Sequence, residues 1–152
     1  MKKPKAKGEK LSATKVQNAV NAAIRRRDGA CMVRDGRHEC AGCLTASHFF
    51  SRGGNGALKY YPFNIFTQCL GHHGIHERNQ ENQDPAFYAR WLERHYPEEL
   101  AWMESARFVV IRYTQALLAE IYEAAKSDRL DDLAEIIYRE IGNRPGDARE
   151  GA

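Results

Sequence analysis

Two short stretches near the middle of the chain have a spacing typical of zinc ligands. Positions 40–43 read CAGC and positions 69–72 read CLGH, so each stretch carries two ligand-type side chains three residues apart. Zinc takes four Cys or His ligands in a tetrahedron, and a close pair lets one turn of the chain supply two of them. Glycine inside each pair allows a tight backbone bend. The sequence therefore predicts a structural Zn²⁺ site made by Cys40, Cys43, Cys69 and His72.

Two neighbouring residues leave this ligand set open. Cys31 is the remaining cysteine and could replace one ligand, and His73 could exchange roles with His72. The alternative is that the cysteines are ordinary reduced thiols that bind no metal. A disulfide framework is not expected, because four cysteines in 152 residues are too few for a secreted scaffold.

Length and composition predict one domain. A chain of 152 residues with 43% hydrophobic residues can form one core, and a second full domain would not fit. The chain has no apolar run of the length that spans a membrane, and its basic N-terminus is not followed by an apolar segment. We therefore expect an unexported cytoplasmic protein with no membrane partner.

The pattern along the chain predicts an α+β fold. Residues 1–10 are rich in Lys and are expected to be a disordered basic tail. A helix should begin after Ser12, a typical N-cap, and end at Gly29. Residues 30–68 have short apolar runs broken by Gly-rich turns, which favours a β-hairpin with a long polar loop, followed by a short helix over residues 72–79.

The C-terminal half is expected to be helical. One helix should follow Asp84 and Pro85 and close at Pro97, and further helical patterns cover residues 100–126 and 130–141. The expected organisation is therefore a core over residues 11–97, a helical extension over residues 98–142 and a flexible end over residues 143–152. The Leu and Ile residues of the extension are candidates for a homodimer surface.

A second set of polar residues has the chemistry of phosphodiester hydrolysis. This reaction needs a base that activates water and a cation that neutralises the charge on the phosphate. His48 ends a predicted strand, Asn64 lies between the two Cys segments, and His73 and His76 are three residues apart, hence on one face of the expected helix. This order of His, Asn and His is the order that gives HNH endonucleases their name.

Four motifs resemble the NinG (Rap) type of phage recombination nucleases within the HNH superfamily. These motifs are HFFSRG from His48, NIFTQC from Asn64, H-x-x-H-E from His73 and D-P-x-F-x-x-x-W from Asp84. The resemblance covers residues 25–105. It implies a ββα-metal core, stapled by zinc, between an N-terminal helix and the helical C-terminal extension.

The resemblance also implies roles for individual residues. His48 matches the general base, Asn64 the residue that orients the catalytic loop, and His73 the helix ligand of a catalytic metal, with His76 as its partner. We expect this second ion to be Mg²⁺ or Mn²⁺, although imidazole ligands also suit Zn²⁺ or Ni²⁺. Ser47 stands where many HNH enzymes have a metal-binding aspartate, so Glu77 is a candidate substitute.

Positive charge gathers in the first half of the chain. Residues 1–60 hold 13 Lys and Arg against 4 Asp and Glu, whereas residues 61–152 hold 10 against 16. This asymmetry is expected if the first half approaches a polyanion, and the alternative is ordinary solvated charge. The candidates for phosphate contacts are Arg25, Arg26, Arg27, Arg52 and Lys59.

Together these features predict a metal-dependent DNA endonuclease. The resemblance further implies branched recombination intermediates, such as Holliday junctions or D-loops, as substrates, and a location in the cytoplasm of a phage-infected host cell. Two alternatives are a zinc-binding adaptor that binds DNA without cutting it and an HNH nuclease that acts on RNA.

Overall fold

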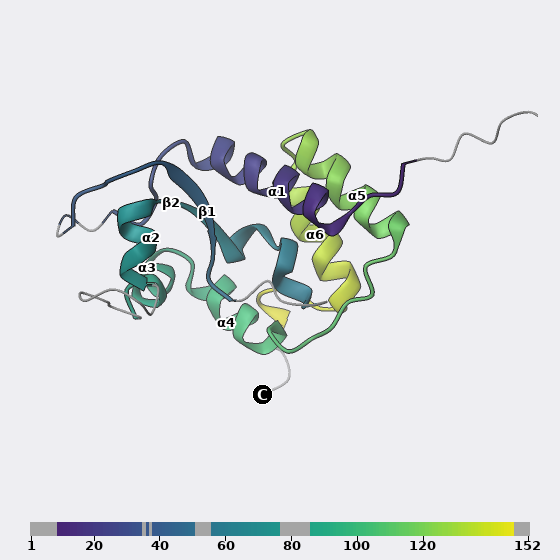
Figure 1. Cartoon of the computed structure of the whole chain (residues 1–152). Coiled ribbons are helices and arrows are strands. Elements are labelled where there is room, and N and C mark those ends of the chain that lie inside the picture. The colour runs from purple at the N-terminus through teal and green to yellow at the C-terminus, as the bar shows by residue number, and fades with distance from the viewer. Residues whose placement is uncertain (1–8, 35, 37, 51–55, 77–85, 148–152) are drawn as a thin grey trace, which may run out of the picture.

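The computed structural model describes residues 9–34, 36, 38–50, 56–76 and 86–147. In these residues the chain forms six α-helices and one two-stranded antiparallel sheet, which confirms the expected α+β class (Figure 1). The elements in chain order are α1 (Ala13–Asp28), β1 (Leu44–His48), β2 (Ile65–Cys69), α2 (Leu70–His76), α3 (Phe87–His95), α4 (Pro97–Ala106), α5 (Gln115–Lys126) and α6 (Leu130–Ile141). Two 3-10 turns, η1 (Ala57–Tyr60) and η2 (Pro62–Asn64), precede β2. Most of the predicted disordered tail, residues 1–8, and residues 148–152 of the flexible end lie outside the described residues.

Both ends of α1 are formed by the residues that the sequence indicated. The Ser12 hydroxyl accepts a hydrogen bond from the Lys15 N–H at 3.1 Å, which satisfies one donor of the first turn. Gly29 has φ 67°, in the left-handed region, and its N–H donates to the Arg25 carbonyl. The apolar side of the helix, with Val20 and Ile24 among its buried residues, faces the core.

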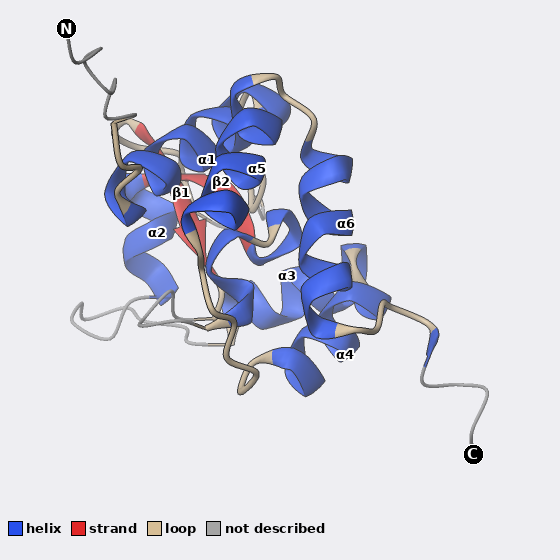
Figure 2. Ribbon diagram, turned by 90° about the vertical axis from the view of Figure 1, so that its right-hand side faces the viewer, coloured by secondary structure: helices blue, strands red, loops and turns tan. Residues whose placement is uncertain are grey.

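The sheet and α2 form a continuous strand, strand and helix unit. β1 pairs with β2 from Leu44 opposite Cys69 to His48 opposite Ile65. α2 begins at the residue after β2, and both α1 and α2 pack against the two strands (Figures 1 and 2). Every residue of β2 is buried. This packing places His48 at one end of the sheet and the start of α2 at the other.

The helical pattern over residues 100–126 is interrupted, which differs from the expectation. α4 ends at Ala106 and α5 begins at Gln115. Between them Arg107 and Phe108 form a turn, after which Val110 forms a β-bridge with Gly56 and the Val109 carbonyl accepts a hydrogen bond from the Ala57 N–H at 2.9 Å. Val109, Val110 and Ile111 are consecutive β-branched residues, which disfavour a helix and favour extended backbone. Pro97, expected to close α3, also occupies the first turn of α4.

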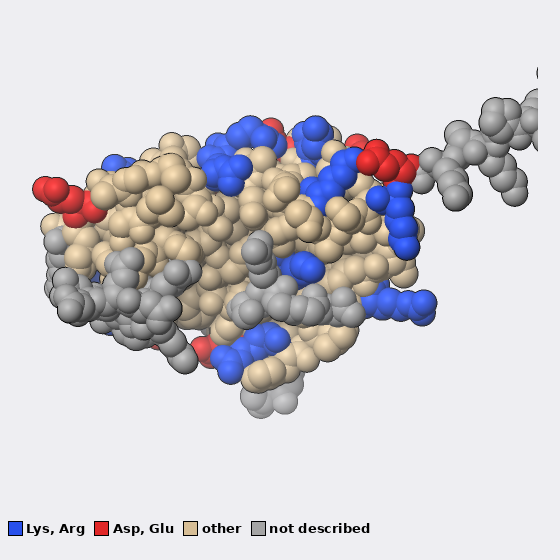
Figure 3. Space-filling model, viewed as in Figure 1, with Lys and Arg blue, Asp and Glu red and all other residues tan. Residues whose placement is uncertain are grey.

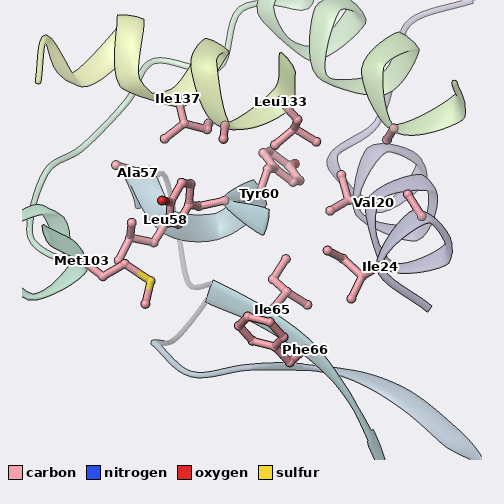
Figure 4. Close-up of a cluster of buried hydrophobic side chains, with 14 of the residues drawn as sticks. Val20, Ile24, Ala57, Leu58, Tyr60, Ile65, Phe66, Met103, Leu133 and Ile137 are labelled. Atoms are coloured by element: carbon pink, nitrogen blue, oxygen red, sulfur yellow. The ribbon is translucent and has the colours of Figure 1, made fainter. Parts of the chain in front are cut away.

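One hydrophobic core joins the N-terminal helix, the middle segment and the C-terminal helices. Figure 4 shows side chains of α1, η1, β2, α4 and α6 meeting in this core, with Val20, Tyr60, Ile65, Met103 and Leu133 among those labelled. The apolar faces of α5 and α6 are thus buried inside the molecule. A homodimer through these helices would have to use their polar outer faces. None of the described helices has the length and apolar character needed to cross a bilayer.

Candidate metal centre and histidine site

Three cysteines and one histidine converge at the end of the sheet. The ligand atoms of Cys31, Cys40, Cys69 and His72 all lie within 4.8 Å of one another. Cys31 follows α1, Cys40 precedes β1, Cys69 ends β2 and His72 is in the first turn of α2. Three stretches of the chain therefore meet at this point: the residues after α1, the turn before β1, and the junction of β2 with α2.

The geometry of the group fits a tetrahedral zinc ion. Zinc bonds of about 2.3 Å to sulfur and about 2.0 Å to nitrogen imply a sulfur to nitrogen separation of roughly 3.6 Å in a tetrahedron. The His72 Nδ1 atom lies 3.1 Å from the Cys69 sulfur and 3.7 Å from the Cys40 sulfur, on either side of this value. Thiolate and imidazole are also the donors that zinc prefers. The residues present therefore fit the expected structural metal.

The ligand group contains Cys31 where the sequence favoured Cys43. Cys43 is exposed, and its carbonyl accepts a hydrogen bond from the Leu70 N–H at 3.1 Å, which continues the strand pairing. Cys31 is buried, and the Met32 N–H next to it donates to the Thr67 carbonyl of β2 at 2.9 Å. Cys31 has no partner at C-x-x-C spacing, so only this tertiary contact reveals its position.

Gly42 shapes the turn that brings Cys40 to the group. Its φ is 76°, in the left-handed region, where a side chain is strained. A Cβ atom at this position would also lie 3.0 Å from the Leu70 Cβ atom. The turn before β1 can therefore pack closely on the start of α2 only with glycine here.

The two buried cysteines have opposite pKa shifts. Burial raises the pKa of Cys31 to about 11. Burial alone would also raise the pKa of Cys69, but hydrogen bonds from the His72 backbone and imidazole and from the Ala41 backbone lower it to about 6. Near neutral pH, Cys69 is therefore a thiolate before metal arrives, whereas Cys31 must lose a proton when it becomes a ligand.

This difference predicts how zinc affinity depends on pH. Of these two residues, only Cys31 is still protonated above about pH 6. Zinc binding then releases one proton from the pair. Each pH unit therefore raises the apparent zinc affinity at least about tenfold. Below about pH 6 Cys69 is protonated as well, and the dependence becomes steeper. Competition with a chelator at a series of pH values measures both slopes. An affinity that does not change with pH would contradict the ligand assignment.

His48 ends β1 with its ring held by a backbone carbonyl. The His48 Nε2 atom lies 3.0 Å from the Lys59 carbonyl oxygen in η1. A carbonyl can only accept, so in this contact Nε2 carries the proton and the lone pair of the neutral ring is on Nδ1. The contact therefore selects the tautomer in which Nδ1 is the basic atom.

Asn64 connects the two sides of the loop that follows His48. It is fully buried, and its Oδ1 accepts a hydrogen bond from the Phe50 N–H at 2.8 Å. Its Nδ2 donates to the carbonyls of Phe50 at 3.1 Å and Leu58 at 3.0 Å. One amide side chain thus holds the chain just after His48 to the η1 turn that receives the His48 ring.

Replacing Asn64 with alanine is expected to lower the free energy of unfolding by about 2–3 kcal/mol. The change removes three hydrogen bonds and leaves polar groups of Phe50 and Leu58 without this partner in a buried place. Urea unfolding of both proteins measures the effect. The exposed Asn18→Ala in α1 is the matched control and should change stability by less than about 0.5 kcal/mol. Equal effects of the two substitutions would contradict the role of Asn64.

The other expected histidines lie on α2. His72 belongs to the metal group, and His73 follows it as a half-buried residue. The side chain of His76 and the residue Glu77 lie outside the described residues. Ser47 is buried, and its carbonyl accepts a hydrogen bond from the Tyr88 hydroxyl at 3.0 Å.

The candidate phosphate contacts have different surroundings. The Arg27 guanidinium lies at the surface and donates to the Asp28 carboxylate and to the carbonyls of Pro62 and Ile65. Asp28 in turn accepts a hydrogen bond from the Thr67 N–H at 2.7 Å. These four hydrogen bonds make Arg27 a clamp between α1 and β2, and its role as a phosphate contact stays a prediction.

The remaining basic candidates lie closer to solvent. Arg25 is exposed, Arg26 forms an exposed ion pair with Asp128 at 2.7 Å, and Lys59 is half-buried. Arg52 lies outside the described residues. On the face shown in Figure 3, Lys and Arg side chains predominate over Asp and Glu.

The comparison with protein families gives a match over most of the chain. A family model for the bacteriophage lambda NinG protein matches residues 1–129. Neither the curated proteins nor the solved structures that we compared include a significant match. The matched region contains the whole metal group, His48, Asn64 and the helices up to α5. The chain therefore belongs to the NinG family of phage recombination-associated proteins.

Proposed function

We propose that this protein is a metal-dependent DNA endonuclease of the HNH type. The observation that carries the proposal is the hydrogen-bonded arrangement at the end of β1. There the His48 ring is held by the Lys59 carbonyl, and Asn64 fastens the adjoining loop to the same 3-10 turn. A positioned imidazole with a defined tautomer is the requirement for a general base.

His48 removes the proton from the attacking water. Its Nδ1 accepts this proton. The proton on Nε2 stays on the ring and remains hydrogen-bonded to the Lys59 carbonyl, which stabilises the imidazolium as it forms. Asn64 takes no part in the proton transfer. It keeps the backbone just after His48 fixed to the η1 turn, so that little reorganisation is needed when the reaction begins.

The catalytic metal belongs to a second site, separate from the cysteine group. His73 and His76 would hold it from α2, and when bound it would neutralise charge on the phosphate and the leaving oxygen. Imidazole donors suit Mn²⁺ better than Mg²⁺, which prefers oxygen ligands. Ser47 is buried and offers no carboxylate, so we expect a preference for Mn²⁺.

The substrate we propose is branched DNA formed during recombination. Membership of a phage recombination-associated family supports this substrate class, and the concentration of positive charge in residues 1–60 supports a polyanionic partner. The zinc group then has a structural role, because its four ligands tie the end of α1 and the turn before β1 to β2 and α2.

A cleavage assay tests the proposal directly. Purified protein with its zinc retained is incubated with supercoiled plasmid, a four-way junction and a duplex of the same sequence, with Mg²⁺, Mn²⁺ or neither. We expect cleavage that requires added metal, is fastest with Mn²⁺ and favours the junction.

Competing RNA and DNA in the same assay distinguish the two nucleic acids. Binding to DNA with no cleavage under any metal would instead indicate a zinc-containing adaptor protein. Cleavage suppressed more strongly by RNA than by DNA would indicate an RNA-directed nuclease.

A further inference from the structure

The connection between α4 and α5 presents an unusual combination of exposed side chains. Phe108 is 78% exposed and Val110 is 72% exposed, more than any other large apolar residue that the structure describes. The Arg107 guanidinium lies 4.5 Å from the centre of the Phe108 ring and 5.3 Å from the centre of the Phe50 ring. A cation packed on an aromatic ring in this way restrains the orientation of both. We call Arg107 and Phe108 the platform.

The platform adjoins the candidate base. The Lys59 carbonyl of η1 contacts the His48 ring. At the start of the same turn, Gly56 forms a β-bridge with Val110, and the Ala57 N–H donates to the Val109 carbonyl. The Tyr113 hydroxyl adds a hydrogen bond to the Gly56 carbonyl at 2.9 Å. The same short turn thus contacts His48 through Lys59 and the α4–α5 connection through Gly56 and Ala57.

The chemistry of the platform fits an unpaired nucleobase. An exposed aromatic ring gives a flat face on which any base can stack, and Arg107 and Arg112, both exposed in the same connection, match the charge of the flanking phosphates. Figure 3 shows Lys and Arg side chains in this region of the surface. The apolar area is one ring and one valine, far less than a stable protein dimer buries.

We propose that Phe108, held by Arg107, stacks on an unpaired base of DNA and thereby directs the enzyme to branch points. The inference rests on the proposed function and specifies its substrate. Bases of an intact duplex are stacked on both sides and offer no free face, whereas a branch point or an extrahelical base does. Phe108 is thus a specificity residue rather than a catalytic one.

Binding measurements on matched DNA probes test this role. The probes are a fluorescein-labelled duplex with one extrahelical adenine and the same duplex fully paired. The protein carries His48→Ala, so that no cleavage interferes. We expect Phe108→Ala to weaken binding of the extrahelical probe about tenfold or more and to leave the paired duplex unchanged. Replacing the extrahelical adenine with 2-aminopurine should give a fluorescence change on binding that depends on Phe108.

Two control variants separate stacking from general surface effects. Val110→Ala removes an exposed apolar side chain of the same connection and should leave both affinities unchanged. Phe108→Trp keeps an aromatic face and should preserve the preference. A Phe108→Ala protein that keeps the full preference for the extrahelical base, or that loses affinity for both probes equally, would overturn the inference. Failure of the His48→Ala parent protein to bind either probe would also overturn it.

The inference and the proposed function can fail separately. If the wild type cleaves DNA with added metal and Phe108→Ala keeps the preference for the extrahelical probe, only the role of the platform is rejected. A preference that depends on Phe108, in a protein that never cleaves DNA, would reject the nuclease and keep the platform as a DNA-binding feature.

Discussion

Replacing His48 with alanine is expected to lower the rate of DNA cleavage by about 10²–10⁴-fold at saturating metal and substrate. In the proposed mechanism the imidazole takes the proton from water, and its Nε2 atom contacts the Lys59 carbonyl. DNA binding should change little, because His48 acts on the water and not on the phosphate backbone. Single-turnover cleavage of a junction, with affinity measured in parallel, separates the two effects.

A matched histidine provides the control for this substitution. His95, at the end of α3, is exposed and stacks near Trp91, and His95→Ala should cleave DNA at the wild-type rate. Losing the hydrogen bond from His48 should lower the free energy of unfolding by only about 1 kcal/mol, so the variant stays folded. Undiminished cleavage by a folded His48→Ala protein would remove His48 from the mechanism.

Replacing Cys31 with serine is expected to abolish stable zinc binding, whereas Cys43→Ser should retain a full equivalent of zinc. Cys31 belongs to the group of four ligand atoms, and Cys43 is an exposed residue outside it. Structural zinc sites contribute apparent free energies of about 10–16 kcal/mol, so losing one thiolate should also lower the melting temperature sharply. Metal analysis after dialysis and thermal unfolding measure both consequences.

Cobalt substitution keeps this test valid if Cys31→Ser unfolds. Co²⁺ bound to the wild-type chain should show thiolate charge-transfer absorption, and Cys43→Ser should give the same spectrum because all three thiolates are still present. The opposite result is that Cys43→Ser loses its zinc and Cys31→Ser keeps it. This result would show that the C-x-x-C pair supplies the ligands and that Cys31 does not.

Local features of the chain were predictable because they depend on neighbours in sequence. The start and end of α1 follow from the capping chemistry of Ser12 and the backbone freedom of Gly29. α6 spans Leu130–Ile141, as its apolar periodicity indicated. Three of the four residues in the metal group were also recognisable from their spacing.

The tertiary structure decided the features that depend on contacts between distant segments. Cys31 joins the metal group because residues after α1 pair with β2, and Arg27 is a clamp because it reaches Pro62 and Ile65. The extended connection before α5 forms because Val109 and Val110 find backbone partners at Gly56 and Ala57. Spacing and periodicity carry no information on such pairings, since the free energy that selects them comes from burial and hydrogen bonds made only when the chain is folded.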